Sequence, residues 1–133
     1  MTHPLDGIDL VVFDKDGTLI EFHAMWGGWA ARLADDLEAA TGHSLREPLH
    51  AMLGYDASTG QVVAGGHLAA TPMARIRDEV ARLLRREGCD GALTDAALAA
   101  AWRAPEPVAL ARPLTDLVSL FGALIASGRR VAV

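Results

Sequence analysis

The chain begins with a short, nearly continuous apolar run from Ile8 to Phe13 that is rich in β-branched residues. Such a run is typical of a strand buried on both faces, as in the centre of a parallel sheet. The run ends abruptly at the polar segment Asp14-Lys15-Asp16-Gly17. A buried strand that opens into paired carboxylates indicates a functional site at the carboxyl end of that strand.

Apolar residues then recur at helical spacing. The first predicted helix ends near Gly42 and carries its apolar face at Trp26, Trp29, Ala30, Leu33, Leu37 and Ala40. Ser44 and Glu47 have capping-box spacing ahead of a second helix, which Gly54 ends. The glycine-rich stretch 54–71 predicts a long loop, a kind of segment that is often functional or mobile.

Two further helices are predicted before a proline-rich boundary. Thr71 and Pro72 suit the N-cap and first turn of a helix that Gly88 ends. Thr94 can cap the next helix, and the segment Pro105-Glu106-Pro107 ends it. This segment is the strongest boundary signal in the chain.

The C-terminal part of the chain returns to an α/β pattern. Apolar residues from Leu114 to Ile125 predict an amphipathic helix that Gly128 ends, and residues 129–133 begin a second strand. A strand, a crossover helix and a second strand form half of a parallel α/β unit, but the stretch of about 85 residues after the first strand is far longer than a crossover needs. We therefore expect an incomplete α/β core at 1–21 and 109–133, with residues 22–108 inserted as a helical lid domain.

Composition and charge narrow the class of protein. The 133 residues are 51% hydrophobic and 22% charged, with a formal net charge of −5. These values suit a globular core and do not suit a nucleic-acid binder. The single cysteine, Cys89, rules out an internal disulfide and fits a reducing compartment. With no signal-peptide pattern and no apolar run of about 18 residues, we expect a cytoplasmic protein without a membrane span; the oligomeric state is left open.

The residues best suited to catalysis lie at the end of the first predicted strand. Asp14 and Asp16 are two residues apart, so in an extended strand they would share a face while Lys15 points elsewhere. Two such carboxylates repel each other unless a cation neutralises them, and Mg²⁺ bound through oxygen would do so and could bridge to a phosphate. Gly17 permits a turn that brings backbone N–H groups toward the site, and the Thr18 hydroxyl can orient a carboxylate.

This pair of carboxylates suits phosphoryl transfer. One carboxylate can attack phosphorus to form an aspartyl phosphate, and a second can protonate the leaving oxygen and then activate water. A calcium loop of the EF-hand type fits less well, because Glu21 falls too early and a strand precedes the motif. A solvated turn after a strand is the plain alternative.

The apolar strand followed by Asp14-Lys15-Asp16-Gly17-Thr18-Leu19 resembles the first motif of the haloacid dehalogenase (HAD) superfamily. The resemblance implies that Asp14 is the nucleophile and that Asp16 is the general acid/base, whose backbone carbonyl also binds Mg²⁺. It implies an α/β, HAD-like Rossmannoid core with a helical cap inserted after the first strand. It covers the whole chain in layout but only one motif in sequence. An Asp at position 16 favours phosphatases and phosphomutases over the dehalogenase and ATPase branches, which lack it.

The resemblance also implies elements that the sequence does not show. The family uses a Ser or Thr that grips the phosphate, a Lys that balances its charge and further acidic metal ligands, all beyond the second strand. Lys15 is the only lysine, and its place beside the nucleophile does not match that role. We therefore expect the 133 residues to be the N-terminal portion of a longer enzyme, with weak metal binding and little turnover alone.

The general resemblance is to phosphoglycolate-phosphatase-type enzymes, so the expected substrate is a small phosphorylated metabolite. His67 and Arg75 are weaker candidates for substrate contact, against ordinary roles in a surface loop and on a helix face. A phosphomutase would keep both aspartates, and a phosphate-release assay against sugar phosphates would separate it from a phosphatase. A non-catalytic binding module would show no Mg²⁺-dependent phosphatase activity.

Overall fold

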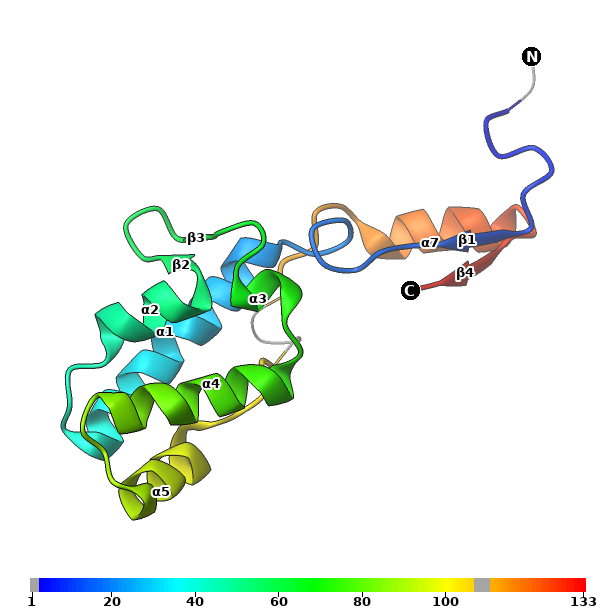
Figure 1. Ribbon diagram of the computed structural model, residues 1–133. Helices are drawn as coiled ribbons and strands as arrows, with labels where there is room; N and C mark the ends of the chain where they lie inside the picture. The colour runs from blue at the N-terminus through cyan, green and yellow to red at the C-terminus, as the bar shows by residue number, and fades with distance from the viewer. Residues whose placement is uncertain (1–2, 107–110) are drawn as a thin grey trace. The chain divides into compact units, whose positions relative to one another are not determined.

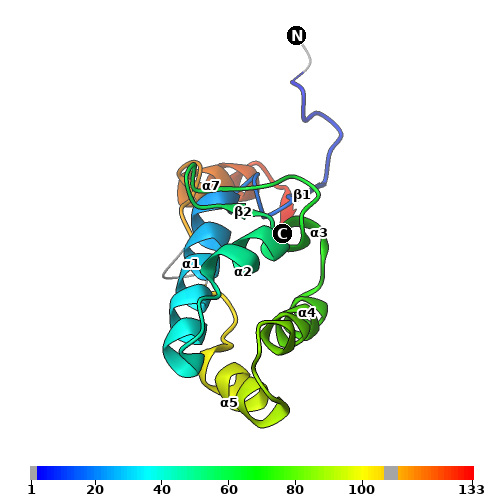
Figure 2. The ribbon, with the colours of Figure 1, turned by 60° about the vertical axis from the view of Figure 1, so that its left-hand side comes forward.

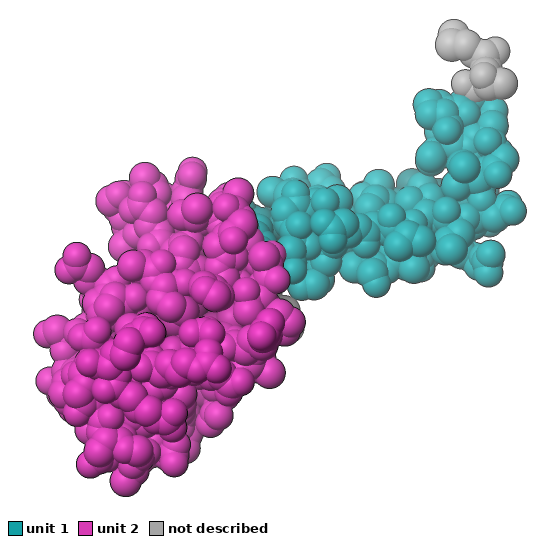
Figure 3. All heavy atoms as spheres, viewed as in Figure 1, with its two compact units in different colours: residues 1–22, 111–133 teal, residues 23–110 magenta. Residues whose placement is uncertain are grey.

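A computed structural model, which describes residues 3–106 and 111–133, shows a mixed α/β chain (Figure 1). It divides into two compact units, coloured separately in Figure 3. Unit 1 combines residues 1–22 with 111–133, and unit 2 comprises residues 23–110. The chain thus leaves unit 1 after its first strand and returns to it for the last helix and strand. Pro107, part of the expected boundary, lies outside the described residues.

Unit 1 is built on two parallel strands. β1 (Leu10–Val12) pairs with β4 (Arg130–Ala132) in the register Leu10↔Arg130 to Val12↔Ala132. Helix α7 (Leu117–Ala126) lies alongside this pair in Figure 1, and the rings of Phe13 and Phe121 meet at a centroid distance of 5.6 Å. The predicted closing helix and second strand are therefore confirmed. Asp116 caps α7 by accepting a hydrogen bond from the Ser119 N–H.

The expectation that the first strand is buried on both faces is wrong for this structure. Leu10 and Val12 expose 44% and 66% of their surface, although they belong to the apolar run that predicted burial. Within the described part of unit 1, the buried apolar residues are Leu19, Ile20 and Leu124. Strands of a parallel sheet are buried on both faces when helices cover both sides of the sheet. Here a single helix lies beside two strands, so apolar strand residues stay open to solvent.

Unit 2 is mainly helical. Its elements, in chain order, are α1 (Phe22–Thr41, whose first residue belongs to unit 1), α2 (Arg46–Leu53), β2 (Tyr55–Asp56), β3 (Gln61–Val62), α3 (His67–Ala70), α4 (Met73–Arg86) and α5 (Gly91–Ala101). Figures 1 and 2 show α4 and α5 as neighbours from two directions, and α2 also contacts α4. These helices enclose one apolar core between them.

Part of that core is a cluster of three tryptophan side chains. Trp29 is fully buried and makes edge-to-face contacts with Trp26 and Trp102 at centroid distances of 6.0 and 5.4 Å. The Trp29 Nε1–H donates to the carbonyl oxygen of Arg103 at 2.7 Å, so its polar atom is satisfied. The helical spacing of the tryptophans thus reflects packing inside unit 2.

Helix starts differ from the predicted ones. The hydroxyl of Ser44 caps nothing, and α2 begins at Arg46 with Leu45 at its N-cap. The helix after Thr71 starts at Met73 with Pro72 at the N-cap, and Thr71 instead ends α3. Thr94 lies inside α5 and is buried, while Asp90 caps that helix through the Leu93 N–H at 2.8 Å. In each case the prediction placed the N-cap at a Ser or Thr, whereas the helix has another residue at its N-cap.

The stretch 54–71 is not a featureless loop. It contains the antiparallel pair β2–β3, with Tyr55 opposite Val62, followed by the short helix α3. The Val62 N–H donates to Nδ1 of His23 at the start of α1, at 2.9 Å. Gly54 ends α2 in the left-handed conformation (φ 73°), as its position in the sequence predicts.

Candidate active site

The two candidate aspartates lie in a tight loop that follows β1. The strand ends at Val12, so Asp14 and Asp16 are beyond the extended segment from which a shared face was inferred. The Phe13 N–H still donates to the Ala132 carbonyl at 2.9 Å, and the chain turns between Lys15 and Ile20. β1 therefore does not include the two aspartates, and a shared face for their carboxylates stays a prediction.

Backbone hydrogen bonds close this loop. The Lys15 carbonyl accepts from the N–H groups of Leu19 and Ile20, at 2.9 and 3.2 Å. Gly17 takes a left-handed conformation (φ 77°), and its own N–H donates to the Ile20 carbonyl at 2.9 Å. A residue with a Cβ would be strained at this position. The expected need for glycine in the turn thus has a direct geometric reason.

The segment that re-enters unit 1 after unit 2 forms hydrogen bonds with the end of the loop. Leu19 and Ile20 are buried, with 4% and 8% of their surface exposed. The Leu114 N–H donates to the Leu19 carbonyl at 3.0 Å, and the Glu21 N–H donates to the Arg112 carbonyl at 2.8 Å. Segments about ninety residues apart in sequence therefore fix the polar loop at the carboxyl end of β1.

Charge in the loop is arranged around Lys15. Asp14 is exposed and Asp16 is half-buried, and Lys15 Nζ donates to Asp16 Oδ1 at 2.9 Å. Lys15 therefore does not point away from the carboxylates, as the strand argument predicted. The lysine side chain is 51% exposed, so this ion pair contributes little to stability. Its effect is local, because it places a positive charge beside the Asp16 carboxylate.

The backbone N–H groups assigned to phosphate binding are occupied within the loop. That of Gly17 is bonded to Ile20, and that of Thr18 donates to the Lys15 carbonyl at 3.3 Å. Thr18 is exposed on the loop surface. The phosphate-binding role of Gly17 and Thr18 accordingly stays a prediction.

The chemistry of the loop donors can be compared with that of a magnesium site. Asp14 and Asp16 supply carboxylate oxygens and Asp16 also supplies a backbone carbonyl, and Mg²⁺ in proteins is commonly held by one or two carboxylates together with water and substrate phosphate. Over the described ranges, 3–106 and 111–133, no group of three or more His, Cys, Asp or Glu side chains is gathered as a metal site. The loop donors are of the chemical kind that Mg²⁺ takes in proteins, and binding of Mg²⁺ by this loop stays a prediction.

The weaker candidates belong to the other unit. His67 begins α3, with its Nδ1 3.2 Å from the Thr71 hydroxyl, and together with Gly54, Gly65 and Gly66 it lines a cavity of about 610 Å³ in unit 2. Arg75 is exposed on α4, and no described acidic residue forms an ion pair with it. Contact of either residue with a substrate remains a prediction.

Sequence reasoning missed a larger concave surface in unit 2. A groove of about 660 Å³ lies over α2 and the β2–β3 turn, with Tyr55 and Asp56 among its lining residues. Ser58 donates to Asp56 Oδ1 through its N–H at 2.9 Å and its hydroxyl at 2.6 Å, and these bonds lower the pKa of Asp56. The spacing Asp56-x-Ser58 is a local turn signal that could have revealed the ordered wall of this groove.

Comparisons with known proteins give no relative. We found no match to this chain among protein-family models, curated proteins or solved structures. Within the described part of the chain, no helix combines the length and apolar character needed to cross a bilayer. The functional argument therefore depends on the loop and on the resemblance of its motif.

Proposed function

We propose that Asp14 and Asp16 form the catalytic pair of a Mg²⁺-dependent phosphomonoester hydrolase of the HAD type. In this proposal unit 1 is part of the catalytic core and unit 2 is the inserted helical cap. The observation that carries the proposal is the loop after β1, which presents two carboxylates two residues apart at the carboxyl end of a parallel strand. Left-handed Gly17 and hydrogen bonds to the Lys15 carbonyl close that loop.

The first chemical step would be transfer of the phosphoryl group to Asp14. A carboxylate oxygen of Asp14 attacks phosphorus, the ester P–O bond breaks, and the leaving alkoxide takes the proton of the Asp16 carboxyl group. Bound Mg²⁺, held by the Asp14 carboxylate and the Asp16 backbone carbonyl, would supply the positive charge that offsets repulsion between the Asp14 carboxylate and the phosphate. The exposed position of Asp14 leaves its oxygens open to a small phosphoester.

The second step would release phosphate. Asp16, now a carboxylate, removes a proton from water, and the water oxygen attacks the phosphorus of the aspartyl phosphate so that the bond to Asp14 breaks. Lys15 bears on this cycle because its ammonium contacts Asp16 Oδ1 at 2.9 Å. A protonated Asp16 has lost the charge that holds this pair, so the pair weakens whenever Asp16 carries the catalytic proton.

Phosphate release by the protein as its gene encodes it tests the proposal. With Mg²⁺ and small phosphomonoesters such as p-nitrophenyl phosphate and 2-phosphoglycolate, we expect Asp14→Asn to lower kcat by at least about a thousandfold, because it removes the nucleophile. Asp9→Asn is the matched control, since Asp9 is an exposed carboxylate directly before β1, at the end of the strand opposite to the loop. It should leave kcat unchanged. Undiminished turnover in the Asp14 variant would refute the proposal. Transfer of phosphate between positions of a sugar phosphate, without release, would identify a phosphomutase.

A further inference from the structure

The groove of unit 2 has a preformed aromatic wall. Tyr55 stands edge-to-face against His50, with 4.9 Å between ring centroids. On its other side the ring lies so close to the backbone of α1 that a Cβ at position 27 would be 2.8 Å from Tyr55 Cε2. The Tyr55 ring is thus held between two helices while it lines the groove. A ring fixed in this way binds a partner with little loss of conformational freedom.

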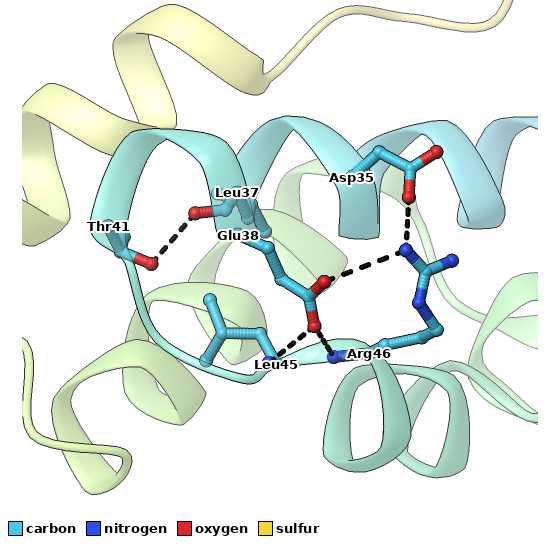
Figure 4. A network of polar contacts seen from close by, with 6 residues as sticks. All are labelled: Asp35, Leu37, Glu38, Thr41, Leu45 and Arg46. Atoms are coloured by element: carbon cyan, nitrogen blue, oxygen red, sulfur yellow. Dashed lines mark hydrogen bonds and ion pairs between the residues drawn. The ribbon is translucent and has the colours of Figure 1, made fainter.

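The charges around this wall are mostly negative. Glu38, Glu47 and Asp56 line the groove, with Arg46 as the single cationic side chain. Figure 4 shows that Arg46 is already engaged by Asp35 and Glu38. Burial lowers the pKa of His50, which is therefore neutral near pH 7 and adds no positive charge. Among the described residues, Glu47 and Asp56 have no ion-pair partner. An aromatic face beside carboxylates that form no ion pair is an environment suited to a guanidinium group.

The chain itself presents such groups on α4. Arg75, Arg82 and Arg86 are exposed and are separated by seven and four residues, so they form one stripe along the helix. The opposite face of α4 is buried through Ile76, Val80, Leu83 and Leu84. Only Arg82 of this stripe forms an ion pair within the described residues, with Glu79. Glu79 lies on the same face of α4, so the stripe carries three guanidinium groups and one carboxylate, a net positive charge on a chain whose formal net charge is −5.

We propose that the groove beside Tyr55 binds the arginine stripe of α4 from a second copy of the chain. One arginine would stack on the Tyr55 ring while its guanidinium N–H groups donate to Glu47 or Asp56. Groove and stripe are different surfaces of unit 2. Two copies that exchange the contact reciprocally form a closed, isologous dimer, whereas a one-way contact is heterologous and gives a longer assembly.

The salt dependence of self-association tests this contact in the unaltered chain. By sedimentation equilibrium at about 20 mM salt, we expect the average mass to rise with concentration from 14.0 kDa to at least double that value. At about 500 mM salt the association should be lost, because ion pairs are screened. The exposed apolar residues of unit 1 offer another route to association, but apolar contacts are not weakened by salt. A chain that is monomeric in low salt, or an association that persists in high salt, would overturn the proposal.

Charge reversal locates the contact. The double variant Arg75→Glu/Arg86→Glu, and separately Glu47→Arg, should each weaken association in low salt by at least about tenfold, because each places like charges together. A mixture of the two variants should associate more tightly than either alone. Arg103→Glu is the matched control, being exposed and outside α4, and should associate as the unaltered chain does. Circular dichroism confirms the fold of each variant, and full association of both variants would refute this site.

Discussion

At the scale of single residues, Glu38 shows how a side chain can cap a helix other than its own. It lies on α1, and its Oε1 accepts hydrogen bonds from the N–H groups of Leu45 and Arg46 at 2.8 and 2.7 Å (Figure 4). These are among the N–H groups that the start of α2 leaves without helical partners. The hydrogen bonds from Arg46 and Leu45 lower the pKa of Glu38. The stabilisation is therefore present above the unfolded value of 4.5 and is lost as the pH falls through the lower folded value.

Removal of this cap should destabilise unit 2. Glu38→Ala is expected to lower the free energy of unfolding by about 1 kcal/mol, the usual cost of a lost N-cap. The three tryptophans all lie in unit 2, so urea unfolding followed by tryptophan fluorescence reports on that unit. Glu47→Ala is the control, because Glu47 is exposed in the first turn of α2 and caps no N–H. Equal losses in the two variants would contradict a capping role for Glu38.

His50 predicts a second pH dependence. It is 6% exposed, its Nε2 has no hydrogen-bond partner among the described residues, and burial lowers its pKa from 6.5. As the pH falls below 6.5 the unfolded chain takes up a proton that the folded chain does not hold, so the fold loses stability. We expect His50→Phe to flatten the decline in melting temperature between about pH 7.5 and about pH 5.5. An unchanged slope would show that another group is responsible.

Predictions for single residues are confirmed where the sequence signal is local. Gly17 and Gly54 have the positive φ values that their positions predict. The capping role of Glu38 was not predictable, because it joins two helices through a contact seven and eight residues away that no short motif records. Lys15 was placed wrongly for a related reason: the strand ends before it, so alternation no longer governs where it points.

At the scale of elements, apolar periodicity predicted the long helices well. The helix expected over 26–40 is confirmed by α1, and those after residues 72 and 114 are confirmed by α4 and α7. The burial predicted for the first strand was wrong, and the β2–β3 hairpin was not predicted. Burial depends on what covers the sheet, which one strand cannot specify, and β2 and β3 are only two residues long, too short to show alternation.

The packing of α1 against the hairpin gives an element-scale prediction. A Cβ at position 27 would meet Tyr55 Cε2 at 2.8 Å and the Gly60 carbonyl oxygen at 3.4 Å. Gly27→Ala should therefore lower the free energy of unfolding by about 1–3 kcal/mol through overpacking, despite the better helix propensity of alanine. Gly91→Ala, where nothing lies within 4 Å, should be neutral or slightly stabilising in the same urea titration. Stabilisation by the Gly27 substitution would show that Tyr55 moves freely.

At the scale of the whole molecule, the two units differ in how much apolar surface they bury. Most of the buried side chains belong to unit 2, whereas unit 1 leaves Ile8, Leu10, Val12, Val118 and Ile125 between 43% and 85% exposed. A unit that buries little apolar surface gains little stability from the hydrophobic effect. The division into two units was expected from the long insert after the first strand, but the open faces of unit 1 could not be read from apolar composition alone.

Hydrogen exchange should therefore separate the two units. We expect amide protons of β1, β4 and α7 to exchange at least about tenfold faster than those of α1 and α4, because local opening costs less where fewer apolar contacts are lost. Two-dimensional NMR or mass spectrometry of the 133-residue chain resolves these segments. Equal protection across both units would show that unit 1 is stabilised by contacts beyond those described.

The central claim, that Asp14 is a phosphoryl acceptor and Asp16 a proton-transfer group, is tested most directly by trapping the intermediate. Radiolabelled acetyl phosphate is a suitable donor because its leaving group needs little protonation, so labelling depends on the nucleophile more than on the general acid. We predict Mg²⁺-dependent label on the protein as its gene encodes it, stable to acid and released by hydroxylamine. Asp14→Asn should abolish the label, while Asp16→Asn should retain it for longer, because water is no longer activated. Label that persists in the Asp14 variant, or no label in the unaltered protein, would contradict the account.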